Sequence, residues 1–123
     1  MSGGTKAPYR TRQELFELAV RGLRGQGWKQ SLWVEGTVES CSYRGTEGRR
    51  CAIGWCIPDE VYDENLEGKT VWESSVVRTA AGVHPDDRPF AVLLQDTHDL
   101  NGGRAMEETF RRLARDYGLE WPE

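Results

Sequence analysis

The sequence has 123 residues, a length that suits one domain built on one hydrophobic core. Hydrophobic residues make up 37% of the chain and charged residues 29%, a balance that argues against intrinsic disorder. The formal net charge of −4 argues against a dedicated binder of duplex nucleic acid and against a polybasic membrane anchor, because both need a positively charged surface.

The N-terminal segment, residues 1–9, is rich in glycine and polar residues, and we expect it to be flexible ahead of a single domain over residues 10–123. It has no apolar stretch of the kind that a signal peptide requires, and no apolar run in the chain approaches the roughly 20 residues that span a bilayer. We therefore expect a cytoplasmic protein that does not bind membranes. In that compartment its three cysteines should be reduced thiols.

The first predicted element is a helix that starts after Thr11 and runs through residue 24. Thr11 and Glu14 have the spacing of a capping box, in which each side chain bonds a free backbone N–H of the other. Apolar residues follow at helical intervals, and Gly25 and Gly27 are natural ends because glycine accepts the left-handed conformation.

Residues 31–57 are predicted to be extended. Within them, segments 41–43 and 49–53 flank the sequence Gly-Thr-Glu-Gly, which indicates a β-hairpin because glycine accepts the backbone angles of a tight turn. The register stays open, since turns of two and of three residues place Cys51 opposite different partners. Pro58 ends the second strand because it has no N–H to donate.

The second half of the chain is predicted to be mainly helical. Residues 71–77 fit either a short strand or the start of a helix capped by Ser74. Asp87 can cap a helix that has a proline in its first turn, and residues 106–117 follow a helical period that Gly118 ends. We therefore expect an α+β fold in which a small antiparallel sheet with a central β-hairpin packs against about three helices.

All the cysteines lie close together in the sequence, which permits two structural interpretations. Cys51 and Cys56 stand in the apolar run Cys-Ala-Ile-Gly-Trp-Cys-Ile, where free cysteines behave as small buried hydrophobes. Alternatively, Cys41, Cys51, Cys56 and His98 hold a structural zinc ion, although neither a C-x-x-C nor an H-x₃₋₅-H pair is present. The first interpretation is favoured, and no cofactor is expected.

A catalytic interpretation uses Cys51 as a nucleophile and His98 as its base. Asp96 and Asp99 flank His98 and are available to orient its ring. However, no motif typical of a cysteine enzyme surrounds any cysteine. His98 also falls on the apolar face of its predicted helix, where a histidine is more often a hydrogen-bonded core residue.

The aromatic residues suggest a binding surface. The sequence has five tryptophans, and large aromatics both fill cores and anchor interfaces. Arg44 belongs to the one local basic spot of the chain, at the predicted hairpin tip. If the protein binds a partner, we expect contacts from the exposed members of one group: Tyr43, Arg44, Trp28, Trp33 and Trp72.

Residues 41–62 follow the pattern C-x-Y-R-G-x-x-G-x-x-C-A-I-G-x-x-I-P-D-E-x-Y. This pattern resembles a set of small uncharacterised proteins encoded by phages and prophages. The wider match includes residues 29–31, 67–68, 94–95 and 98–99. The resemblance implies no catalytic residue. It implies an accessory role in the host cytoplasm, such as binding and redirecting a host defence or regulatory factor.

We therefore expect a non-enzymatic accessory protein that acts by protein–protein binding. Two alternatives stand beside it, a hydrolase or transferase that uses Cys51 and His98, and a small zinc-stabilised domain. The predicted partner is another protein, and neither duplex nucleic acid nor a membrane is expected to bind.

Overall fold

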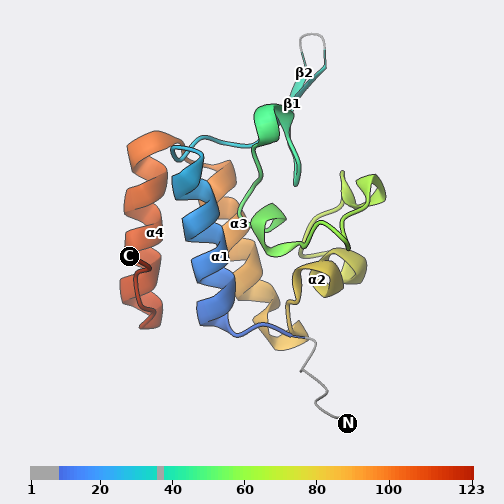
Figure 1. Cartoon of the computed structure of the whole chain (residues 1–123). Coiled ribbons are helices and arrows are strands. Elements are labelled where there is room, and N and C mark those ends of the chain that lie inside the picture. Colours follow the sequence, from blue (N-terminus) through green and yellow to red (C-terminus); the bar gives the residue numbers. More distant parts are fainter. Residues whose placement is uncertain (1–8, 36–37) are drawn as a thin grey trace.

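The computed structural model describes residues 9–35 and 38–123, and it consists mainly of helices (Figure 1). The helices α1, α3 and α4 lie side by side, with α4 on one flank and the segment between residues 42 and 74 on the other. The α-helices are α1 (Arg12–Gly25), α2 (Ser75–Ala81), α3 (Arg88–Asp99) and α4 (Gly103–Tyr117).

Two further expectations concern the N-terminal segment and membrane-spanning helices. Of the predicted flexible segment 1–9, all but Tyr9 lies outside the described residues. Among the residues that are described, no helix is both long enough and apolar enough to cross a membrane.

The predicted α+β fold, a sheet with a central hairpin on about three helices, is wrong. In the described chain, extended structure is confined to one short ribbon in which β1 (Leu32–Glu35) pairs antiparallel with β2 (Val38–Cys41). Leu32 lies opposite Cys41 at the base of this ribbon. The ribbon projects away from the helices, so no sheet packs against them (Figure 1). The fold is built from four α-helices instead.

The hairpin predicted between segments 41–43 and 49–53 is not formed either. One isolated bridge, between Arg44 and Arg50, joins the two segments. The Gly-Thr-Glu-Gly sequence between them does turn the chain, as the 3₁₀ turn η1 (Thr46–Gly48). The glycines therefore indicated the turn correctly, but the flanking residues do not continue into a ladder.

The buried run 51–57 folds into tight turns rather than a strand. The N–H of Trp55 bonds to the carbonyl of Cys51 at 3.1 Å, and the 3₁₀ turn η2 (Gly54–Cys56) follows. A short apolar run does not by its pattern distinguish a buried strand from a helical turn. Here the run packs directly under α1, which turns can do as well as a strand.

The helix ends follow the predictions where a specific group defines them. Thr11 and Glu14 form the predicted capping box of α1, and the Ser74 side chain caps α2, which decides between the two alternatives for that segment. Gly118 ends α4 in the left-handed conformation, with φ of 64°. Asp87 stands at the start of α3 but makes no capping hydrogen bond; its carboxylate pairs with an arginine of α1 instead.

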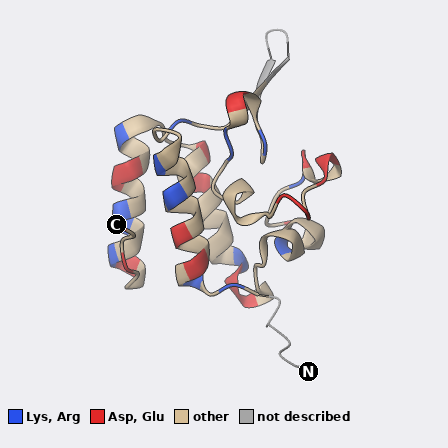
Figure 2. Cartoon of the chain, in the orientation of Figure 1, with Lys and Arg blue, Asp and Glu red and all other residues tan. Residues whose placement is uncertain are grey.

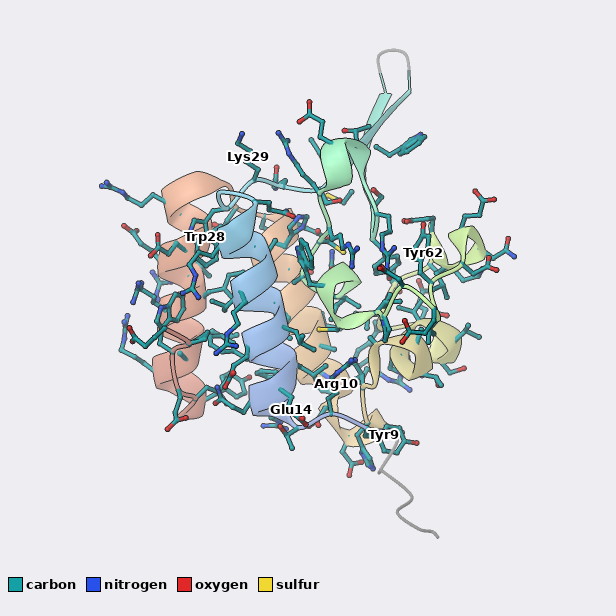
Figure 3. The ribbon with its side chains drawn as sticks, in the orientation of Figure 1. Tyr9, Arg10, Glu14, Trp28, Lys29 and Tyr62 are labelled. Carbon is teal, nitrogen blue, oxygen red and sulfur yellow. The ribbon has the colours of Figure 1, made fainter. Side chains whose placement is uncertain are left out.

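The core lies between α1, α3 and α4 and continues into the buried turns 51–57 and α2. Phe16 of α1 packs on Phe110 of α4 with ring centroids 6.2 Å apart, and Trp28 stacks on Trp121 at 6.2 Å. Trp28 lies at the end of α1 beside α4 (Figure 3). Arg10 joins this bundle to the rest, because its guanidinium donates to carbonyls of η2 and α2.

A substitution at Gly54 tests the close packing of η2. A Cβ added there would lie 2.2 Å from the backbone oxygen of Tyr43, which no rotamer change can relieve. We expect Gly54→Ala to lower the free energy of unfolding by about 1–3 kcal/mol in chemical denaturation. Gly25→Ala is the control: its Cβ meets nothing within 4 Å, and the gain in helix propensity should leave stability equal or up to about 1 kcal/mol higher. Equal stability of the Gly54 variant and the native chain would contradict this packing.

Candidate functional site

Two adjoining cavities border the loops that precede α2; the larger lies between these loops and α3, and the smaller between these loops and the base of the β1–β2 ribbon. The larger has a volume of about 640 Å³ and the smaller about 410 Å³. Both are lined by Cys41, Ser42, Glu67 and Gly68, so they meet along these residues. We call the two cavities together the groove. Its further walls are formed by Trp33, residues 69–73 and one face of α3.

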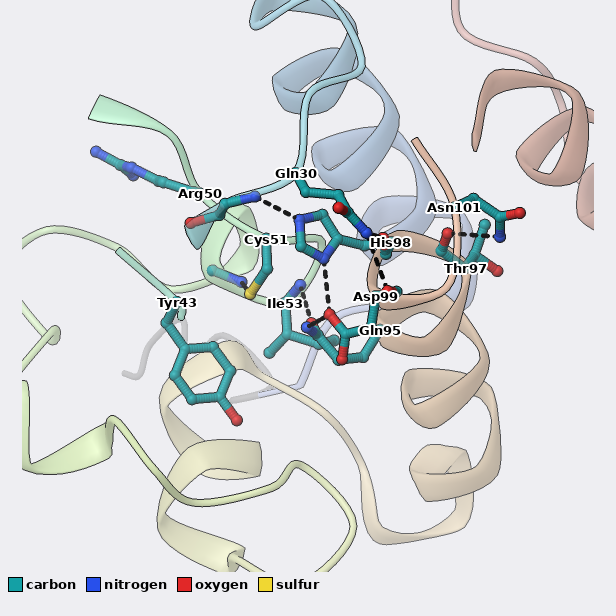
Figure 4. Close-up of polar contacts among 12 residues, drawn as sticks. Gln30, Tyr43, Arg50, Cys51, Ile53, Gln95, Thr97, His98, Asp99 and Asn101 are labelled. Atoms are coloured by element: carbon teal, nitrogen blue, oxygen red, sulfur yellow. Dashed lines mark hydrogen bonds and ion pairs between the residues drawn. The ribbon is translucent and has the colours of Figure 1, made fainter. Parts of the chain in front are cut away.

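A chain of hydrogen bonds at the end of α3 supports the groove wall. The backbone N–H of Ser31 donates to Nε2 of His98 at 2.8 Å, and Nδ1 of His98 lies 2.7 Å from Oδ1 of Asp99 (Figure 4). The His98 side chain is fully buried, whereas Asp99 reaches the wall of the larger cavity.

The Ser31 bond fixes the tautomer of His98. A backbone N–H can only donate, so Nε2 must accept and carries no proton. The proton of the neutral ring is then on Nδ1, from which it is donated to Asp99. Both ring nitrogens are thus occupied in bonds that hold the fold.

Two glutamines complete this network. Gln30 donates from Nε2 to the backbone carbonyls of His98 and Asp99, at 3.1 and 2.9 Å, and so satisfies the end of α3. Gln95 donates to Oδ1 of Asp99 at 2.8 Å and accepts from the N–H of Ile53 at 3.1 Å. The network therefore connects α3 to residues 30–31, which precede β1, and to the buried turns 51–57.

Glu67 is the centre of a second network on the opposite wall. Its carboxylate accepts from the N–H of Tyr43 at 2.9 Å, the N–H of Arg44 at 3.0 Å and the hydroxyl of Tyr62 at 2.7 Å. The Arg44 guanidinium lies over the Tyr62 ring, 4.3 Å from its centroid, and pairs with Asp59 at 2.9 Å. Burial and the bond to Glu67 raise the pKa of Tyr62 to about 12.

A buried arginine shapes the third wall. Arg78 is only 8% exposed, and its Nη1 donates to the carbonyls of Val71 and Trp72 at 3.0 and 2.6 Å. These bonds position the loop so that Val71 is buried while Trp72 stays half exposed at the cavity. The guanidinium of Arg88 lies 5.0 Å from the Trp72 ring centroid.

The thiols differ in exposure. Cys51 and Cys56 are buried, as the apolar run predicted; burial raises the pKa of Cys56 to about 12 and that of Cys51 well above its usual range. Cys41 is exposed in part, with its sulfur set against the groove wall. Desolvation there, and then the charge of Asp99, raise the pKa of Cys41 to about 11.

The geometry gives no support to catalysis by Cys51 with His98. A buried thiol with a raised pKa is a poor nucleophile near neutral pH. His98 cannot serve as its base, because Nε2 accepts from Ser31 and Nδ1 carries a proton that is held by a carboxylate. Of the two aspartates expected to orient the ring, Asp99 does so and Asp96 does not. Residues two apart on a helix do not face each other.

The predicted zinc ligands are not brought together as a set. In the described chain, the one metal-compatible cluster of three is Cys41, His98 and Asp99, whose ligand atoms lie within 4.8 Å of one another. Coordination through Nδ1 would move the ring proton to Nε2, against the N–H of Ser31. The donor set therefore fits a metal poorly.

The predicted binding residues divide by exposure. Tyr43 and Trp28 are buried, and the Tyr43 hydroxyl donates to the carbonyl of Lys69. Arg44 is largely enclosed by its ring and carboxylate contacts. Trp33 and Trp72 are each 50% exposed, Trp72 lining the larger cavity and Trp33 the smaller.

We assigned no functional role to Glu67, Ser42 or Gln95 from the sequence, although Glu67 and Gln95 belong to the wider match of the resemblance. Glu67 stood among other acidic residues of a loop, and nothing in that pattern distinguishes a carboxylate that accepts three hydrogen bonds from a solvated one. The spacing of Gln95 and Asp99, four residues apart on a helix, could have indicated their bond.

Several of the residues on which the resemblance was based lie in the two networks. The network of His98 contains Gln30, Ser31, Gln95 and Asp99, and the network of Glu67 contains Tyr43, Arg44, Asp59 and Tyr62. They therefore have structural roles in shaping the groove. In comparisons with known proteins, no family model, no curated protein and no solved structure matches the chain.

Alkylation of Cys41 tests the electrostatics of the groove. At about pH 8 we expect slow labelling of Cys41 by iodoacetamide in the folded chain, because a raised pKa leaves little thiolate. Asp99→Asn removes a negative charge that disfavours the thiolate, so the pKa should fall and labelling should become several-fold faster. Mass spectrometry assigns the labelled site. Asp116→Asn on α4, which removes the same charge away from the groove, is the control and should leave the rate unchanged. Labelling of native Cys41 as fast as in the unfolded chain would contradict this picture.

Proposed function

We propose that this chain is a non-enzymatic protein that acts by binding another protein, and that the groove holds a segment of that partner. The position of two buried polar atoms carries the proposal. Among the described residues, Oγ of Ser42 and Nε of Arg44 are the buried side-chain atoms without a hydrogen-bond partner. Both residues line the groove. A buried polar atom without a partner destabilises a fold by about 1–3 kcal/mol, and a ligand that supplies an acceptor relieves that strain.

The surrounding polar groups make this observation specific. Glu67, which lines both cavities, accepts three hydrogen bonds, and Asp99 accepts bonds from Gln95 and His98. The walls are thus well satisfied, and unmet bonding capacity remains at Ser42, which lines both cavities, and at Arg44, which lines the smaller one. Each unpaired group of this kind calls for an explanation, and we assign these two to contacts with a bound partner.

Exposed aromatic residues stand at both cavities. Trp33 and Trp72 are each half exposed, and tryptophan is enriched among residues that dominate interface energies. A segment lying across both cavities would contact both rings. Its backbone carbonyls would accept from Ser42 and Arg44, and its side chains would enter the cavities, as in other modes of extended-peptide recognition.

A protein segment suits the groove better than nucleic acid. Carboxylates of Glu67, Asp96 and Asp99 line it, and they repel phosphates. The accessory role in a phage or prophage, directed at a host defence or regulatory factor, is proposed on the resemblance alone.

Recovery of a partner from a bacterial lysate tests the proposal when it is compared across variants. We expect Trp33→Ala and Trp72→Ala each to lower recovery of the same protein about tenfold, because each removes an aromatic anchor. Leu100→Ala is the control, since Leu100 is 79% exposed and does not line the groove. Equal recovery with all variants would contradict the proposal.

Ser42→Ala separates binding from a structural role. Removing an unpartnered buried hydroxyl should leave the free chain as stable as the native one or slightly more stable in thermal unfolding. The same variant should lower partner recovery. A loss of stability without any loss of recovery would show that the hydroxyl serves the fold and would contradict its assigned role.

A further inference from the structure

The groove has a strong excess of negative charge. It is lined by five carboxylates, Glu64, Glu67, Glu73, Asp96 and Asp99. In the part of the chain that the structure describes, none of the five forms an ion pair with an arginine or a lysine. Figure 2 shows acidic residues along the loop that precedes α2 and borders the groove.

Two cations line the groove, Arg44 and Lys69, and they offset this excess only in part. Arg44 pairs with Asp59, a carboxylate outside the groove lining, at 2.9 Å. Lys69 turns its ammonium to the backbone carbonyl of Asn65. Both cations are bonded within the chain but keep their charges, and five carboxylates against two cations leave the lining of the groove with a net negative charge.

Asp99 is held as a preorganised anion. Its side-chain partners in the network of His98 are Gln95 and the neutral ring of His98, which are both uncharged donors and both bond to Oδ1. They fix the carboxylate without neutralising it, and Oδ2 receives neither bond. The raised pKa of Cys41, which Asp99 helps to cause, agrees with a negative potential at this wall.

Asp96 stands beside it on the same wall. It is exposed, lines the larger cavity and makes no side-chain bond within the described residues. On a helix, residues three apart have Cβ atoms about 5–6 Å from each other, so Asp96 and Asp99 can contact one cation together. Val92, one turn before Asp96, and Trp72 add an apolar wall.

We infer that the groove binds a basic, extended segment of the partner protein, and that an arginine or lysine side chain of that segment enters the larger cavity between Asp96 and Asp99. This inference rests on the proposed function. The alkyl stem of such a side chain packs on Val92 and Trp72, while its cation reaches the two carboxylates. The backbone of the segment supplies acceptors to Ser42 and Arg44.

A guanidinium suits the two carboxylates particularly well. Its donors form a planar fork that can bond two acceptors at once, and the bonds to anions are charge-assisted. The unpartnered atoms of Ser42 and Arg44 need acceptors, which a peptide backbone provides and a small polyamine does not. These two requirements together favour a peptide over a free cation.

Titration with short blocked peptides tests the inference. The probe is acetyl-Gly-Arg-Gly-Arg-Gly-amide, and its control replaces each arginine with citrulline, which has nearly the same shape and no charge. Binding is followed by the fluorescence of the native chain and by calorimetry. We expect the arginine peptide to bind at least about tenfold more tightly than the citrulline peptide, with affinity that falls as salt is raised.

Two variants of the protein test whether the cation of the peptide binds between Asp96 and Asp99. Asp96→Asn should weaken binding of the arginine peptide about tenfold and reduce its salt dependence, since it removes one of the two carboxylates. Asp116→Asn on α4 removes the same charge away from the groove and should change little. Equal affinity for both peptides, no effect of Asp96→Asn, or spermidine binding as tightly as the peptide would each overturn the inference.

The outcomes separate this inference from the proposed function. If the arginine peptide fails while partner recovery still depends on Trp33 and Trp72, the basic segment is wrong and the protein-binding function stands. If recovery is also independent of both tryptophans, the proposed function is overturned with it.

Discussion

The hydrogen bond from the backbone of Ser31 to Nε2 of His98 is the constraint on which the rest of the site depends. It fixes the ring proton on Nδ1, and Nδ1 in turn holds Asp99 against the groove. The same bond removes His98 as a general base and as a metal ligand, because both roles need a nitrogen that is free to accept. His98 lies near a thiol and an aspartate, but its two hydrogen bonds give it a structural role rather than a catalytic one.

The site combines a well-bonded frame with a small set of unmet contacts. Networks around Asp99 and Glu67 join α3, the base of the ribbon and the loops before α2, and so hold the groove open. Within that frame, and as far as the described residues go, Ser42 and Arg44 keep unpartnered buried atoms and Asp96 keeps an unpaired charge. Most polar residues near the groove have partners within these networks. The unpartnered atoms of Ser42 and Arg44 and the charge of Asp96 indicate that a partner must supply hydrogen-bond acceptors and a positive charge.

The sequence predicted what local rules decide. The capping box at Thr11, the cap at Ser74 and the glycine end at Gly118 depend on neighbouring residues alone, and all are observed. The sheet was wrong because the apolar run 51–57 is consistent with either a strand or buried turns, and only packing under α1 decides between them. The burial of His98 followed from its helix face. Its partner Ser31 is 67 residues away in the sequence, and no local pattern specifies such a contact.

A long-range proton–nitrogen NMR spectrum of the two histidines, recorded at about pH 8 without and with zinc, tests the central claim most directly. The account predicts that His98 carries its proton on Nδ1, and that His84, whose Nδ1 accepts from the N–H of Asp86, carries it on Nε2. The His98 signals should not move when zinc is added. A proton on Nε2 of His98, or a shift of its Nδ1 signal with zinc, would contradict the account and would return His98 to the role of base or ligand.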